Sequence, residues 1–342
     1  GIKLALMCAA LACSPVLARS NTVANGPSIT EADSFVAQAE KEQADFMVIA
    51  SQAQWVNNTY ITDDTDALAA YFGTIGTDMG VRFAKQAATY DNVPGLSYDA
   101  RRKLDFMKQG LVLPAPSTEG AAAELNAIAT RLQSEYGKGK GTLDGKEVNG
   151  SDIEQQMGEL RDPTKLAEMW MSWHDNVGKP MKGDYARLVE IANQGARELG
   201  YKDLGAMWRS GYDMPPDDFA KLMDKLWSQV KPLYDQLHCY TRSKLNAKYG
   251  AAVQPTTGPI RADLLGNMWA QEWGEIYDVV APLGSGDIGY DVTELLKAKA
   301  YEPLKMVRAG EAFFSTHGYD PLPASFWQRT QNTHPPHRQD DC

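Results

Sequence analysis

Histidine and cysteine are scarce in this chain, which has five histidines and four cysteines among 342 residues. It contains no His-Glu-x-x-His motif for zinc, no Gly-x-Ser-x-Gly elbow for a nucleophilic serine and no phosphate loop that ends in Gly-Lys-Ser or Gly-Lys-Thr. It also has no β-alternation of useful length, no internal repeat and no low-complexity tract. The residue chemistry taken alone therefore shows no catalytic centre.

Two of the histidines lie close together in His334-Pro335-Pro336-His337. The paired prolines prevent a helix that would aim both rings at one ion, so we expect an exposed turn here rather than a metal site. His238 and Cys239 fall on a long predicted helix, where we expect a packed core histidine and a buried free thiol. The sequence thus predicts no metal site.

Basic residues are outnumbered by acidic ones, 34 to 44, which gives a net charge of -10. This balance argues against nucleic acid or an anionic membrane as the main partner. Asn57-Asn58-Thr59 and Asn149-Gly150-Ser151 fit the glycosylation pattern, which matters only in a eukaryotic secretory pathway.

The first residues have the layout of a secretory signal peptide. Lys3 precedes an apolar run over residues 4–17, and a small-x-small cleavage site ends at Ala18. We expect cleavage after Ala18 and a secreted or periplasmic protein, with lipoprotein processing at Cys13 as the alternative. The apolar run is too short to be a permanent transmembrane span.

Apolar residues recur at helical spacing through almost the whole chain, so we predict an all-α fold. Thr30 and Asp33 resemble a capping box at the start of the first helix. Asp162-Pro163 supplies an N-cap and a proline at the first helical position, and Gly200 fits the end of that helix. The glycine-rich stretch 137–150 is expected to be a loop. Further helices are predicted over about 63–88, 97–108, 119–135 and 215–250, the last with a kink at Pro232.

One tract, residues 264–273, carries more information. It places Trp269 and Trp273 four positions apart, which predicts that they share one face of a helix. Gln271 would point elsewhere on that helix and carries both a donor and an acceptor. If that amide is buried, protein, water or a bound peptide must satisfy it.

The sequence Gly266-Asn267-Met268-Trp269-Ala270-Gln271, followed by Trp273 and Ile276-Tyr277-Asp278, resembles the G-N-M-W-A-Q-x-W-x-x-I-Y-D signature of the angiotensin-converting-enzyme family. Other family motifs occur in order and at the right spacing over residues 160–330, and the first half of the chain agrees more loosely. These motifs match residues 173–179 (W-R-D-x-x-G-K), 208–212 (W-R-S-x-Y), 233–238 (L-Y-x-x-L-H), 313–314 (F-F), 322–323 (L-P) and 326–327 (F-W).

The resemblance implies an elongated, all-helical shell of two halves that encloses a deep channel, with a lid formed by the first helices. It implies a peptidase that releases dipeptides from peptide carboxyl ends, with zinc held by a His-Glu-x-x-His helix and a later glutamate. By position, Gln271 would hydrogen-bond the carboxylate of the peptide substrate, and Tyr212 would match a chloride-contacting tyrosine. Cys342 corresponds to a cysteine whose disulfide partner lies further along the family's sequence.

On this resemblance, residues 1–18 are a signal peptide and residues 19–342 an incomplete peptidase domain. Lid-like helices would span about 28–110 and a channel wall about 160–330. The chain stops before the zinc motif, so we expect an inactive amino-terminal fragment with no catalytic residue and no tight zinc binding. Such a fragment should expose apolar surface that the other half covers, and be poorly soluble.

Two departures from the animal enzymes point to a bacterial-type member. His174 stands where those enzymes carry a chloride-binding arginine, and histidine is mostly neutral near pH 7. The cysteine pair that closes a small loop in animal members is absent. Two other interpretations remain: a non-catalytic helical module that binds peptides, and a structural helical protein with no ligand.

Overall fold

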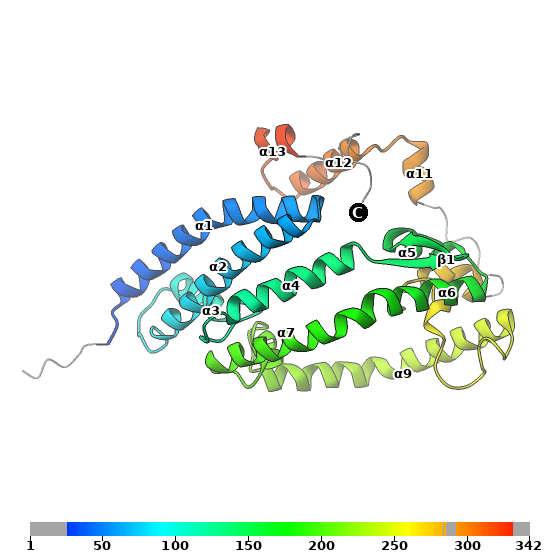
Figure 1. Cartoon of the computed structure of the whole chain (residues 1–342), viewed down its shortest axis with the longest axis horizontal. Helices are drawn as coiled ribbons and strands as arrows, with labels where there is room; N and C mark the ends of the chain where they lie inside the picture. The colour runs from blue at the N-terminus through cyan, green and yellow to red at the C-terminus, as the bar shows by residue number, and fades with distance from the viewer. Residues whose placement is uncertain (1–25, 283, 285–291, 331–342) are drawn as a thin grey trace, which may run out of the picture.

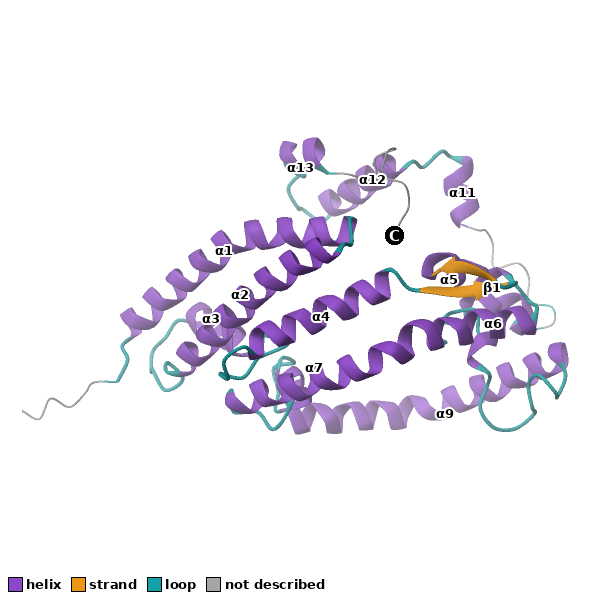
Figure 2. Ribbon diagram, viewed as in Figure 1, coloured by secondary structure: helices purple, strands orange, loops and turns teal. Residues whose placement is uncertain are grey.

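The computed structural model describes residues 26–282, 284 and 292–330. Regular structure in these residues is almost all helical, as Figure 2 shows, so the all-α prediction is confirmed. The predicted signal peptide, the His334–His337 pair and Cys342 lie outside the described residues. The helices are α1 Ile29–Thr59, α2 Asp63–Ala88, α3 Tyr98–Gln109, α4 Ala121–Gly137, α5 Gly150–Glu159, α6 Pro163–Trp173, α7 Lys179–Glu198, α8 Leu204–Ser210, α9 Pro216–Tyr249, α10 Tyr277–Val280, α11 Val292–Ala298, α12 Pro303–Thr316 and α13 Ala324–Arg329.

The long helices lie side by side and give the molecule an elongated shape (Figure 1). Helix α1 packs on α2, α2 on α4 and α4 on α7, while α9 packs on α8 near its start and on α10 near its end. A hairpin of strands β1 (Lys140–Leu143) and β2 (Lys146–Asn149) lies with α5 and α6 at one end of the molecule. Helices α11 to α13 contain no buried residue.

Among the residues that the structure describes, three apolar clusters form the core. One joins α1, α2 and α3, where Phe35 packs against Phe83 and Tyr90. A second joins α4, α7 and α8. The third packs α5 and α6 against residues 264–276, and therefore carries the tract that resembles the family signature.

Several helix ends follow the local sequence as predicted. Asp162 caps α6 by accepting from the N–H of Thr164 at 2.8 Å, and Gly200 has a φ of +89° just beyond α7. The predicted capping box at Thr30 is wrong, because Ser28 is the N-cap of α1. Its N–H donates to the Glu31 carboxylate at 2.7 Å, and its hydroxyl accepts from the Glu31 N–H at 3.2 Å.

The glycine-rich stretch predicted to be a loop forms the β1–β2 hairpin instead. Asp144 and Gly145, which both have positive φ, make its two-residue turn. An Asp-Gly turn of this kind fits the right-handed twist of a hairpin, and the strands are too short to show alternation. Glu168 of α6 accepts from both turn N–H groups, and the bond from Gly145 is the main reason that the pKa of Glu168 is lowered.

Helix α9 has an exposed apolar side. Every residue from 221 to 237 is exposed. The charged residues of this stretch, Asp224, Lys225, Lys231 and Asp235, lie between apolar residues that recur every three or four positions. The apolar residues at that spacing are Met223, Leu226, Val230, Leu233 and Leu237.

This exposure corrects two predictions. Cys239 is an exposed thiol rather than a buried one, and the neighbouring His238 is only half-buried. The buried residues of α9 are Thr241 and Leu245, which both lie towards its end. None of the described helices is both long enough and apolar enough to cross a membrane.

Candidate functional site: the signature turn

Residues 264–273 do not form the predicted helix. They run irregularly between two short 3-10 turns, Ala262–Leu264 and Gly274–Ile276. Gly266 and Ala270 have φ values of +78° and +54°, which a right-handed helix does not allow. A Cβ at position 266 would lie 2.9 Å from the Cβ of Glu275, so the close approach of the chain there requires glycine. We call residues 266–271 the signature turn.

The signature turn is hydrogen-bonded to α5 through Glu154. One carboxylate oxygen accepts from Nδ2 of Asn267 at 2.7 Å, and the other accepts from the N–H of Met268 at 2.9 Å. The Oδ1 atom of Asn267 accepts from the N–H of Trp269 at 2.9 Å, which fixes the direction in which the Asn267 amide faces. The N–H of Ala270 closes the turn on the carbonyl of Asn267 at 3.0 Å.

Packing and two indole groups also hold the turn. Met268 is fully buried in the third apolar cluster. The indole N–H of Trp170 on α6 donates to the carbonyl of Met268 at 3.1 Å, and that of Trp273 donates to the carbonyl of Ala270 at 3.1 Å. Trp269 is exposed and Trp273 half-buried, so the two tryptophans do not share a helical face as predicted.

Arg161 fixes the chain that follows the turn. It reaches from the end of α5 to α10, where its guanidinium donates to both carboxylate oxygens of Asp278, at 2.9 and 3.2 Å, and to the carbonyl of Glu275 at 2.6 Å. The hydrogen bond from Arg161 is the main reason that the pKa of Asp278 is lowered. Asp278 of the family signature therefore has a structural partner.

Gln271 differs from these residues. Its side chain is exposed, and its amide makes no hydrogen bond to any residue that the structure describes. The amide is therefore not buried, and no buried partner is required for it. The turn presents a free donor and acceptor next to polar groups that are already paired.

Tyr212 lies elsewhere. Its exposed ring stacks on Phe219 at the start of α9, with ring centroids 4.1 Å apart. Trp273, which lies two residues from Gln271, is next to a different part of α9: its ring centroid is 6.1 Å from that of Tyr234. Fifteen residues separate these two points of α9, which is about 22 Å at 1.5 Å per residue. The structure therefore does not bring the two predicted site residues together.

An ion pair lies next to Tyr212. The next residue, Asp213, pairs with Arg102 of α3, with one bond at 2.8 Å, and the hydrogen bond from Arg102 lowers the pKa of Asp213. The guanidinium of Arg102 is thus already paired with a carboxylate. His174 lies at the start of a π-helical turn, stacked on Trp170 at 4.0 Å, and its Nδ1–H donates to the Trp170 carbonyl at 2.7 Å.

The described residues do not fit a zinc site. Within them, no three His, Cys, Asp or Glu side chains come together in a way that could hold a metal ion. The remaining histidines of the tail, His334 and His337, lie outside this part of the chain. No step through zinc follows from these residues.

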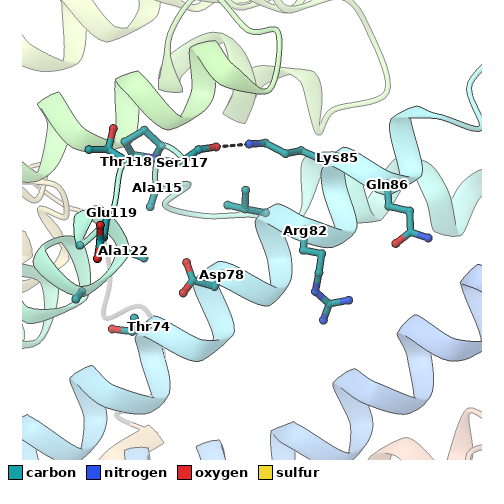
Figure 3. Close-up of a pocket in the computed structure, with 14 residues that line it drawn as sticks. Thr74, Asp78, Arg82, Lys85, Gln86, Ala115, Ser117, Thr118, Glu119 and Ala122 are labelled. Carbon is teal, nitrogen blue, oxygen red and sulfur yellow. Dashed lines mark hydrogen bonds between the residues drawn. The ribbon is translucent and has the colours of Figure 1, made fainter.

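A separate hollow of about 800 Å³ lies between α2 and the segment that precedes α4 (Figure 3). Asp78, Arg82 and Lys85 line one side, and Ser117 lies opposite. The Lys85 ammonium donates to the Ser117 hydroxyl, and that hydroxyl donates to Glu198 at 2.6 Å. The charged side chains that line this hollow are of both signs and are partly paired. None of the predicted site residues lines it.

No sequence pattern pointed to Glu154, Arg161 or Trp170. Each lies about a hundred residues before its partner in the signature turn or just after it, and a single Glu, Arg or Trp gives no local signal of such a contact. Only the signature residues themselves were recognisable.

Comparison with known proteins defines the family. The family model described as angiotensin-converting enzyme (peptidase M2) matches residues 27–342, so the chain belongs to that family. It is 31% identical over 280 residues to angiotensin-converting enzyme of Mesocricetus auratus, covering 80% of this chain and 21% of that protein. It is 28% identical over 305 residues to angiotensin-converting enzyme of Haematobia irritans exigua, covering 87% of this chain and 49% of that protein. Against the angiotensin-converting enzyme-related protein of Drosophila melanogaster, the identity is 30% over 293 residues, which is 83% of this chain and 45% of that protein. The chain thus spans between about a fifth and about a half of these curated relatives.

Proposed function

We propose that this chain forms the carboxylate-binding wall and the lid of a zinc peptidyl-dipeptidase, which releases dipeptides from the carboxyl ends of peptides. Family membership supports the class of reaction. The observation that carries the assignment to this region is Gln271, an exposed amide without a partner among the described residues, on a turn whose other polar groups are paired.

In this proposal the amide nitrogen of Gln271 donates to the terminal carboxylate of the peptide. A hydrogen bond to a charged group contributes about 1.5–3 kcal/mol, and this bond would also orient the peptide. Cationic groups that complete the carboxylate site, and the zinc ligands, would come from a part of the protein outside these residues. Zinc would activate a water molecule for attack on the peptide bond.

Further parts of the proposal rest on the sequence. The basic, apolar and small-residue order of residues 1–18 supports export to the periplasm or outside the cell, with cleavage after Ala18. A bacterial-type member is proposed from His174 and from the absent cysteine pair. A disulfide from Cys342 to a later cysteine belongs to the same proposal. A chloride contact at Tyr212 stays a prediction that rests on the family resemblance alone.

The test compares two proteins: residues 1–342 alone, and the gene product read to its stop codon. Release of dipeptide is measured from an amino-blocked tripeptide with a free carboxylate and from its carboxamide. We expect the full product to cleave the free acid in a chelator-sensitive way and the carboxamide poorly, and residues 1–342 to cleave neither. Chelator-sensitive dipeptide release by residues 1–342 alone would contradict the proposal.

A non-catalytic peptide-binding module is the second candidate, because the exposed Gln271 amide on an otherwise paired turn suits binding without catalysis as well. It predicts that the full gene product binds the free acid more tightly than the carboxamide, without any turnover. Calorimetric titration alongside the cleavage assay separates the two.

A further inference from the structure

We propose that Glu154 is a positioning residue for the carboxylate site: it holds the signature turn in the one conformation that presents Gln271 to a peptide. The inference rests on the proposed function of Gln271. It concerns a residue of α5, which lies 113 positions before its partner Asn267 and outside every family motif that the sequence displays.

Glu154 satisfies two donors that solvent cannot easily reach. Asn267 is 8% exposed and Met268 is 0% exposed, yet each directs an N–H at one oxygen of the Glu154 carboxylate. A buried donor without an acceptor is strongly unfavourable, and a carboxylate supplies two acceptors at a fixed separation. Glutamate is therefore matched to this pair of donors.

Ala270 is a strained residue within the signature turn. Ala270 has a φ of +54°, which costs an alanine free energy that glycine would not pay, and it lies one residue before Gln271. Once the donors of Asn267 and Met268 are released, the turn can relax towards negative φ at Ala270. Gln271 then points in another direction, although its own side chain is unchanged.

A reversal of hydrogen-bond polarity tests the contact. In Glu154→Gln, one of the two carboxylate oxygens is replaced by an N–H₂ group. Only one acceptor then remains for the two donors of Asn267 and Met268, so one hydrogen bond is lost. In Asn267→Asp, two carboxylates face each other. The double variant restores both bonds, because Gln at 154 donates to Asp at 267 and still accepts from Met268, with the same net charge. Glu159→Gln on the same helix is the matched control, since its exposed carboxylate accepts only from Gln155.

Two readouts are needed. Hydrogen–deuterium exchange of residues 264–273 in the 342-residue chain reports the turn, and KM of the full gene product for the blocked tripeptide reports the site. Each single variant should speed exchange and raise KM about tenfold, with kcat within about twofold, as expected for the loss of a charged hydrogen bond. The double variant should restore both, and Glu159→Gln should change neither.

The outcomes separate the two proposals. Gln271→Ala should raise KM without changing exchange, and an unchanged KM in that variant overturns the proposed role of Gln271. If Gln271→Ala raises KM but Glu154→Gln changes neither exchange nor KM, this inference alone is overturned. Failure of the double variant to recover what the single variants lose also overturns it.

Discussion

Replacing Met268 with alanine should reduce the free energy of unfolding by about 3 kcal/mol. The side chain is 0% exposed and packs in the cluster that contains Met157 and Met169. Loss of its three outer heavy atoms forfeits about 2 kcal/mol of transfer free energy. The cavity adds about 1 kcal/mol more, which lies within the range of about 2–5 kcal/mol for buried Met→Ala changes.

The assay is urea denaturation followed by far-ultraviolet circular dichroism. With a slope of about 3 kcal/mol per molar, the midpoint should fall by about 1 M. Met171→Ala on α6 is the control, because that side chain is 56% exposed and its loss should change stability by less than about 0.5 kcal/mol. A loss of less than about 1 kcal/mol at Met268, or an equal loss at both positions, would refute the reasoning, since the turn would then not be anchored in the core.

Three further outcomes are expected. Gly266→Ala should cost about 2 kcal/mol, because of its positive φ and the 2.9 Å approach, whereas Gly274→Ala, with open space around it, should cost less than about 0.5 kcal/mol in the same assay. Asp278→Asn should remove a contribution of less than about 1 kcal/mol from the exposed pair with Arg161. The pKa of Asp278 in the folded protein is lowered from 3.8, so this contribution is present above the unfolded pKa and disappears as the pH falls through the folded pKa. The stabilities of the variant and the wild type should therefore converge in acid-denaturation curves. A constant difference between them down to pH 2 would argue against this role of the pair. Asn57 should stay unglycosylated in a eukaryotic secretion host, because it is 2% exposed and its amide donates to a carboxylate of α2 at 2.7 Å. Detection of a glycopeptide that contains Asn57 by mass spectrometry would disprove this.

Helix positions were predictable because their signals are local. The bounds of α2 and the cap of α6 follow from residues within four positions, and so does the end of α9 before Gly250, which has a φ of +80°. The first helix shows the limit of such signals. Two overlapping capping patterns begin at Ser28 and Thr30, and only the geometry selects the first.

The signature turn could be recognised but not built from the sequence. Its tryptophan spacing fits a helix, yet Gly266 and Ala270 take positive φ because distant residues fix the chain around them. Those residues, Glu154 and Trp170, lie about a hundred positions away, and no local pattern reveals such contacts. The exposure of Cys239 has a similar origin, since helical periodicity identifies an apolar face but not whether another element covers it.

The reading frame beyond codon 342 tests the central claim most directly, that these residues belong to a zinc peptidyl-dipeptidase and carry its carboxylate-binding wall. Sequencing of the gene should show that the frame continues into a His-Glu-x-x-His motif and a downstream glutamate. A stop codon directly after Cys342 would contradict the zinc peptidase and leave peptide binding without catalysis as the function of the signature turn.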